Sequence, residues 1–128
     1  MAIRTLHDVL KEISSHDGYF HEEDLGPDGL VSVNARGVAG DTPLHVAAWG
    51  DDTADAAILL SAGADPNIAG DMDETPLHVA VRRGNVALIM LLLKAGADPD
   101  VVSEFEESPA GMAAEMGGPV AEAFVRTA

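Results

Sequence analysis

The sequence predicts an all-α repeat protein built from stacked helix-turn-helix units. Residues 42–47, which read TPLHVA, return thirty-three residues later as residues 75–80. The segment GADP at residues 63–66 returns at the same interval as residues 96–99. A fixed period of this length is typical of solenoids, in which each unit buries its apolar face only against its neighbours.

Both copies of TPLHVA match the signature T-P-L-H-x-A, and on these residues the chain resembles the ankyrin repeats. The resemblance implies a solenoid of helix pairs with projecting β-hairpin-like loops. It divides a single domain into a capping helix or degenerate repeat at 1–33, ankyrin repeats at 34–66 and 67–99, and a degenerate C-terminal capping repeat at 100–128.

Residues 4–15 are expected to form an amphipathic capping helix. Thr5 followed by Asp8 forms a capping-box-like pair, and Asp17-Gly18 is expected to end the helix. One apolar stripe has helical spacing and comprises Leu6, Val9, Leu10 and Ile13. Residues 19–33 are dense in turn formers, and either a short second helix at 19–25 or an irregular loop fits them.

Each repeat begins with a hydroxyl residue followed by proline, which predicts a helix N-terminus. Thr42, Thr75 and Ser108 are expected to accept a backbone N–H at these caps. Gly63 and Gly96 follow the second helices, where a left-handed C-terminal residue is needed.

Two departures from the repeat pattern carry expectations of their own. The final helix, residues 120–126, is expected to bury Phe124 and Val125. Asp55 stands one period before Leu88, so the first repeat has less apolar surface to bury. We favour packing of Asp55 against the cap over a contribution to a binding site, because a carboxylate near a helix N-terminus is stabilised.

The charge balance restricts the partners that the chain can bind. It carries 22 Asp and Glu against 7 Lys and Arg, a formal net charge of −15 at pH 7. Nucleic acid and anionic membrane surfaces are not expected as partners, because contacts to phosphate depend on Lys and Arg. The same charge favours a basic protein partner, although solubility alone explains it equally well.

The sequence further indicates a cytoplasmic chain. It contains no cysteine, which excludes disulfides and thiolate metal sites. Charged residues interrupt the first apolar stretch, so no secretory signal pattern is expected. The longest apolar run, residues 86–93, is too short to span a bilayer.

Catalysis, cofactors, metals and small-molecule substrates are not expected. Residues 71–75 spell D-x-D-x-T, which is similar to the nucleophile motif of haloacid-dehalogenase-type phosphatases, but no strand precedes them and Thr75 already serves as a cap. The same loop lacks the ligand spacing of a calcium site. His45 and His78 alone make a poor zinc site. In ankyrin-like proteins this histidine ties its turn to the neighbouring repeat by hydrogen bonds.

The resemblance places partner binding at the loop tips and at the exposed ends of the first helices. Carried over by position, the tips comprise Val38, Ala39 and Asp41; Asp71, Met72, Asp73 and Glu74; and Glu104, Phe105, Glu106 and Glu107; the helix positions comprise Trp49, Arg82, Arg83, Glu115 and Met116. Trp49, Met72 and Phe105 would form an apolar centre surrounded by carboxylates, which is the composition of a binding hot spot. Two alternatives stay open: Trp49 packs partly against the cap, and the arginines pair with the acidic tips.

Together these features predict a non-enzymatic protein–protein interaction module that binds a basic protein on its concave face. A small acidic chain of this kind would suit an immunity or antitoxin protein that covers the basic active site of a toxin. The alternative is a regulatory or scaffold subunit of a larger cytosolic assembly.

Overall fold

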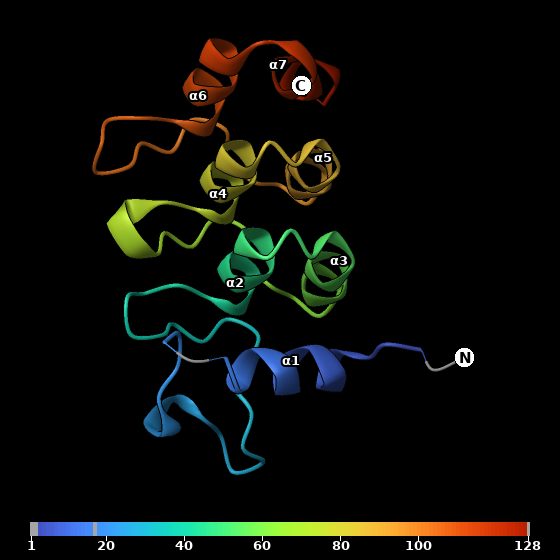
Figure 1. Ribbon diagram of the computed structural model, residues 1–128, viewed down its shortest axis with the longest axis vertical. Helices are drawn as coiled ribbons and strands as arrows, with labels where there is room; N and C mark the ends of the chain where they lie inside the picture. The colour runs from blue at the N-terminus through green and yellow to red at the C-terminus, as the bar shows by residue number, and fades with distance from the viewer. Residues whose placement is uncertain (1–2, 17, 128) are drawn as a thin grey trace.

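The computed structural model describes residues 3–16 and 18–127 and arranges them as a stack of helix pairs (Figure 1). One layer contains α2 (Pro43–Trp49), α4 (Pro76–Arg83) and α6 (Pro109–Met116), and the other contains α3 (Thr53–Ser61), α5 (Val86–Lys94) and α7 (Gly118–Arg126). The described residues contain no strand. The predicted all-α solenoid is therefore confirmed.

The cap helix α1 (Leu6–Ser14) lies across the first end of the stack, against α2 and α3. The backbone N–H of Thr5 donates to Asp8 Oδ2 over 2.9 Å, and the N–H of Asp8 donates to Thr5 Oγ1 over 3.3 Å. The predicted capping box is thus confirmed. Val9, Leu10 and Ile13 are buried as expected. Asp17, predicted to help end this helix, lies outside the described residues.

Residues 19–33 form an irregular connection with a single 3₁₀ turn, η1 (Glu22–Asp24). A second cap helix spanning residues 19–25 is therefore wrong. Phe20 and Val31 are the segment's buried apolar residues, and the spacing between them gives no continuous helical stripe.

The core lies between the two layers of helices. Its fully buried large residues include Leu44, Leu59, Leu77, Leu88, Ile89 and Leu92. Ala48 and Ala80, also fully buried, allow the first helices of successive repeats to approach closely. This packing orients every repeat so that its connecting loop projects on the same side of the stack (Figure 1).

The connecting loops form three fingers, residues 37–41, 70–74 and 103–107. In each finger the first residue's N–H donates to the last residue's carbonyl, as from Gly70 to Glu74 over 2.8 Å. The second finger contains the 3₁₀ turn η2 (Asp71–Asp73). The resemblance implied such β-hairpin-like loops, and the structure has the hairpin-type bond without strands.

Asn34 and Asn67, which keep the repeat interval, join successive units of the stack through side-chain hydrogen bonds. Asn34 donates from Nδ2 to the Gly63 carbonyl over 3.1 Å and accepts the Asp65 N–H over 2.8 Å. Asn67 forms the same pair of bonds with the next unit. Gly63 and Gly96 have φ values of 98° and 95°, so the predicted left-handed positions are confirmed.

The predicted hydroxyl cap is a direct hydrogen bond at Ser108, whereas Thr42 and Thr75 form a capping box with the histidine three residues later. Ser108 Oγ accepts the Gly111 N–H over 3.1 Å. The hydroxyls of Thr42 and Thr75 instead lie 2.9 and 3.0 Å from Nδ1 of the histidine three residues later. Gly111 has no side chain, so the last repeat lacks this contact between hydroxyl and imidazole.

The last helix, α7, buries Val120 and Ala123 against the stack, while Phe124 is half-buried. Val125 is 77 % exposed, so the prediction that it is buried is wrong. Residues three and four apart share a helix face, and Val125 lies on the opposite face from Val120 and Ala123.

Candidate protein-binding groove

Three exposed apolar side chains line one hollow of about 380 Å³ on the finger side of the stack, here called the groove. Trp49 stands at the end of α2, Met72 in the second finger and Phe105 in the third. Their exposed fractions are 38, 48 and 53 %. Separate units of the stack therefore contribute to a single apolar surface, which the sequence had placed together only by repeat position.

Hydrogen bonds between neighbouring fingers fix the shape of the groove. The Val38 N–H donates to the Tyr19 carbonyl, which joins the first finger to the cap segment. Asp41 Oδ1 accepts the Asp71 N–H over 2.9 Å, and the Met72 carbonyl accepts the Glu104 N–H over 3.0 Å. A surface held in this way loses little further freedom when a partner binds.

The structure divides the predicted binding residues into three groups. The groove is lined by Asp41, Trp49, Asp71, Met72, Glu74, Arg82 and Phe105. A neighbouring hollow of about 400 Å³, formed along α6, contains Arg82, Glu107, Glu115 and Met116. Neither hollow includes Val38, Ala39, Asp73, Arg83 or Glu104, all of which are exposed on or beside the fingers.

Two of the predicted finger residues are buried and have structural contacts. Asp41 and Glu74 are only 8 and 7 % exposed. Asp41 bonds the next finger, and Glu74 bonds the guanidinium of Arg82 with Nη2–Oε2 and Nε–Oε2 distances of 2.5 and 3.0 Å. Both carboxylates shape the groove and offer little free surface to a partner.

Arg82 pairs with acidic finger residues, as one of the sequence alternatives stated, whereas the partner of Arg83 lies outside the fingers. Arg82 also approaches Glu107 at 3.7 Å, so it connects the second and third fingers. Arg83 reaches Asp51 at 2.5 Å, with both side chains more than two fifths exposed. An exposed pair of this kind contributes little to stability. Of the exposed acidic tips, Asp71 lines the groove, while Asp73, Glu104 and Glu106 lie on the same fingers outside it.

The floor of the groove contains residues that sequence reasoning assigned only to the fold. His45 and Val79 line it, although both are nearly fully buried. His45 Nε2 lies 2.8 Å from the Glu74 carbonyl, and His78 Nε2 lies 2.9 Å from the Glu107 carbonyl. Because Nδ1 accepts the N–H of the preceding threonine, Nε2 must carry the proton and donate. The structural role implied for these histidines is confirmed.

His45 should make the stability of the fold pH-dependent. Its pKa lies below the ordinary value of 6.5, chiefly because burial disfavours the charged ring, although the Glu74 carbonyl and the Asp41 carboxylate oppose the shift. As pH falls, His45 is therefore protonated in the unfolded chain before it is protonated in the folded chain. The contribution of neutral His45 is complete above about pH 6.5 and is lost as pH falls toward the lowered pKa.

Urea unfolding of the wild-type chain and of a His45→Gln variant, measured between pH 8 and 5, tests this expectation. The carboxylates that also titrate are common to both chains, so the difference in unfolding free energy isolates His45. That difference should shrink as pH falls below about 6.5. A difference that stays constant over the range would contradict the buried neutral ring.

Within residues 3–16 and 18–127, no three His, Asp or Glu side chains are placed to hold a metal ion together. The helices described there include none with the length and apolarity that a bilayer crossing requires.

Comparison with known families adds to this geometry. Residues 39–71 and 72–104 each match the ankyrin repeat family, so two consecutive repeats cover more than half of the chain. The chain belongs to the ankyrin repeat family. No curated protein matches it. Ankyrin repeats are protein–protein interaction modules and are typically non-enzymatic, which gives the chain as a whole a general role in protein–protein interaction.

Proposed function

We propose that the groove binds a basic protein, which inserts one large apolar side chain between Trp49, Met72 and Phe105. The observation that carries the proposal is the apolar hollow itself, which is lined by residues of fingers that carry four exposed carboxylates. Apolar anchors inside a charged border dominate binding energy at interfaces. The net charge of −15 would attract a positively charged partner over a long range.

In its specific form, the proposal is that the chain acts as an immunity or antitoxin protein. The support is the combination of small size, high negative charge and a rigid groove that could cover the basic active site of a toxic enzyme. The proposed boundaries remain a cap at 1–33, repeats at 34–66 and 67–99, and a capping repeat at 100–128. A subunit that regulates or organises a larger assembly is the alternative from another class.

Affinity capture from the native host, followed by mass spectrometry, would separate these two roles. The immunity role requires a captured basic protein that is toxic when expressed alone and harmless when expressed with this chain. Recovery of several subunits of one assembly, with no toxic member, would contradict that role and support the alternative.

The groove itself is tested with the captured partner and the variants Trp49→Ala and Phe105→Ala. Each is expected to weaken binding by about 2 kcal/mol, or roughly thirtyfold, because each removes an aromatic anchor. Isothermal titration calorimetry measures the affinity, and circular dichroism checks the fold. Val125→Ala is the matched control, because Val125 is an exposed apolar residue on the distant helix α7. Unchanged affinity in both groove variants would overturn the proposed binding face.

A further inference from the structure

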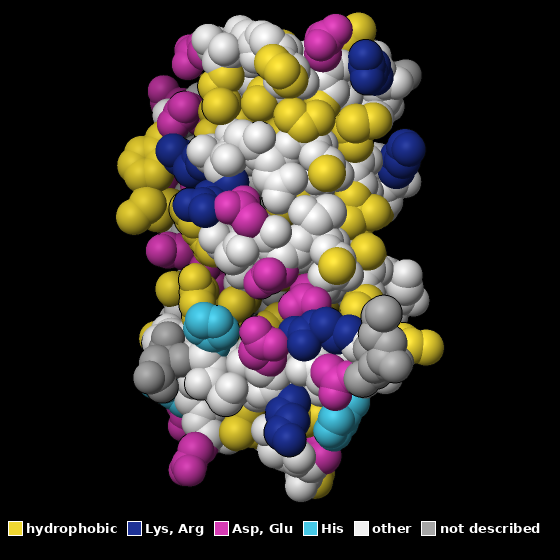
Figure 2. Space-filling view, turned by 45° about the vertical axis from the view of Figure 1, so that its right-hand side comes forward, with side chains coloured by type: hydrophobic (Ala, Val, Ile, Leu, Met, Phe, Trp, Pro, Cys, Tyr) yellow, Lys and Arg dark blue, Asp and Glu magenta, His cyan; other side chains and the backbone are white. Residues whose placement is uncertain are grey.

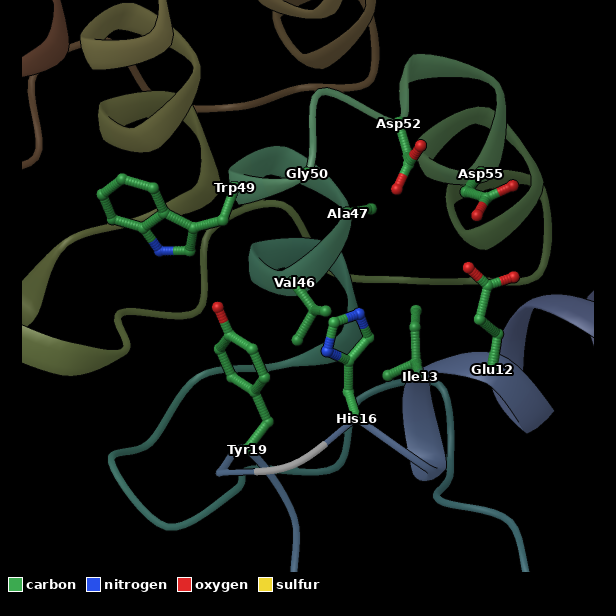
Figure 3. Close-up of a pocket in the computed structure, with 10 residues that line it drawn as sticks. All are labelled: Glu12, Ile13, His16, Tyr19, Val46, Ala47, Trp49, Gly50, Asp52 and Asp55. Carbon is green, nitrogen blue, oxygen red and sulfur yellow. The ribbon is translucent and has the colours of Figure 1, made fainter.

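A second hollow, about 200 Å³ in volume, lies between the cap and the first repeat (Figure 3). Ile13 of α1 faces Val46 and Ala47 of α2 across it, so its floor is apolar. Tyr19, Trp49 and His16 stand on one side. We call this hollow the cap cleft. Trp49 also lines the groove, so the two hollows share a wall.

Three carboxylates, those of Glu12, Asp52 and Asp55, stand on the other side of the cap cleft (Figure 3). Arg4 serves two of them: its Nε and Nη2 lie 2.6 and 2.9 Å from the Asp55 oxygens, and Nη2 lies 2.5 Å from Glu12. The Arg4 guanidinium thus bonds two of the carboxylates, and none of these hydrogen bonds goes to the third, that of Asp52.

Asp52 is the carboxylate that the fold does not use. It occupies the N-cap position of α3, yet its side chain makes no capping hydrogen bond. Asn85 stands one period later at the start of α5 and does cap its helix, accepting the Leu88 N–H over 3.1 Å. Aspartate caps as well as asparagine does. The Asp52 carboxylate instead lies over the cap cleft, close to Gly50. A Cβ built on Gly50 would come within 2.7 Å of Asp52 Oδ2.

The surroundings of Asp52 call for a cation. Partial burial and the neighbouring carboxylates Asp55 and Glu12 raise its pKa, although Arg4, whose hydrogen bonds go to Asp55 and Glu12, offsets part of the shift. A positive group placed between Asp52 and Glu12 would relieve this repulsion. The aromatic side and apolar floor of the cleft suit the aliphatic stem of the same ligand, because long basic side chains bury their stems against apolar surface.

We propose that the cap cleft receives a lysine or arginine side chain of the protein partner. The aliphatic stem would lie on Ile13 and Ala47 beside the ring of Trp49, and the charged head would meet Asp52. Long basic side chains bury their stems in this way while the head stays near water. This inference rests on the proposed function, because the basic side chain belongs to the protein partner proposed there. In that partner, the basic residue would lie next to the apolar anchor, with Trp49 between the two side chains.

The test uses the free protein and a small probe, acetyl-Gly-Arg-Gly-amide, so it does not need the partner. Addition of the peptide should shift the NMR signals of the Trp49 indole N–H and the Tyr19 ring in a saturable manner. The matched peptide with citrulline, which has the same shape and no charge, should cause no such shifts. Equal shifts with both peptides would overturn the proposal.

Charge-matched variants separate specific binding from general attraction to an acidic chain. Asp52→Asn should weaken peptide binding about fivefold and leave the fold intact, because asparagine is also a good N-cap residue. Glu122→Gln removes one charge at an exposed position of α7. The affinity for the peptide should stay within twofold of the wild-type value. Equal weakening in the two variants would contradict a specific site.

Phe105→Ala, which alters only the groove, should bind the peptide as the wild-type chain does. Failure of the peptide to bind would therefore reject the cap cleft while the groove proposal stands. Binding of the peptide, together with unchanged partner affinity in Phe105→Ala, which lines the groove and not the cleft, would reject the groove while the cap cleft stands.

Discussion

Replacing His78 with alanine is expected to lower the free energy of unfolding by about 3 kcal/mol. The ring is fully buried and bonds three groups: the Thr75 N–H, the Thr75 hydroxyl and the Glu107 carbonyl. Alanine leaves these polar groups without their partner in the interior and creates a cavity as well. The change also loosens the last repeat, because the bond to Glu107 joins α4 to the third finger.

Urea unfolding followed by circular dichroism measures this loss. His7→Ala is the matched control, since His7 is exposed on α1 and its replacement should change stability by less than about 0.5 kcal/mol. The slope of the His78→Ala transition should also fall if the last repeat separates from the rest before global unfolding. A loss smaller than about 1 kcal/mol would show that the histidine bonds do not join the repeats.

The repeated part of the chain could be predicted well because each residue there has a counterpart at a fixed interval. The same interval gives Leu44 and Leu77, His45 and His78, and Asn34 and Asn67 equivalent positions in successive units. The contacts that each residue makes recur in the next unit, so one correct alignment of the period gives them all. The prediction for Val125 failed because α7 lies in the degenerate repeat, where the period no longer shows which face is buried.

The cap and its cleft were not predictable in the same way. Arg4 and Asp55 are 51 residues apart, and no periodic relation connects them. The prediction that Asp55 packs against the cap was correct, yet its proposed cause, stabilisation by a helix N-terminus, left out the arginine that pairs with it. The cap cleft depends on how α1 lies across the stack, which only the tertiary structure shows (Figure 1).

The acidic residues of the chain fall into distinct groups once the structure is known. Asp41, Asp55 and Glu74 are buried and stabilise the fold through hydrogen bonds or arginine pairs. The tips around the groove are exposed, and Figure 2 shows Asp and Glu side chains along that edge, interrupted by a group of Lys and Arg. Mutational tests of charge in binding should therefore use the tips, because changes at Asp41 and Glu74 would also remove hydrogen bonds that hold the fingers.

Asp55 and Leu88, one period apart, provide the sharpest test of how the cap stabilises the stack. Leu88→Asp is expected to lower the free energy of unfolding by more than about 4 kcal/mol. Leu88 is fully buried in α5, which packs against α3, α4 and α7, so the new carboxylate would enter the core. Arg4 pairs with Asp55 and Glu12, both next to the cap, so a carboxylate at position 88 in α5 would lack this partner.

The reverse change, Asp55→Leu, should leave stability within about 1 kcal/mol of the wild-type value. A well-packed apolar residue often replaces a partly buried ion pair without loss. Arg4 would keep Glu12 as a partner, so no charge would be left unpaired in the interior. Urea unfolding of both variants measures the contrast. If Asp55→Leu lost as much stability as Leu88→Asp, the Arg4–Asp55 pair would be essential for docking the cap, and the two positions would not be interchangeable sites of one repeat.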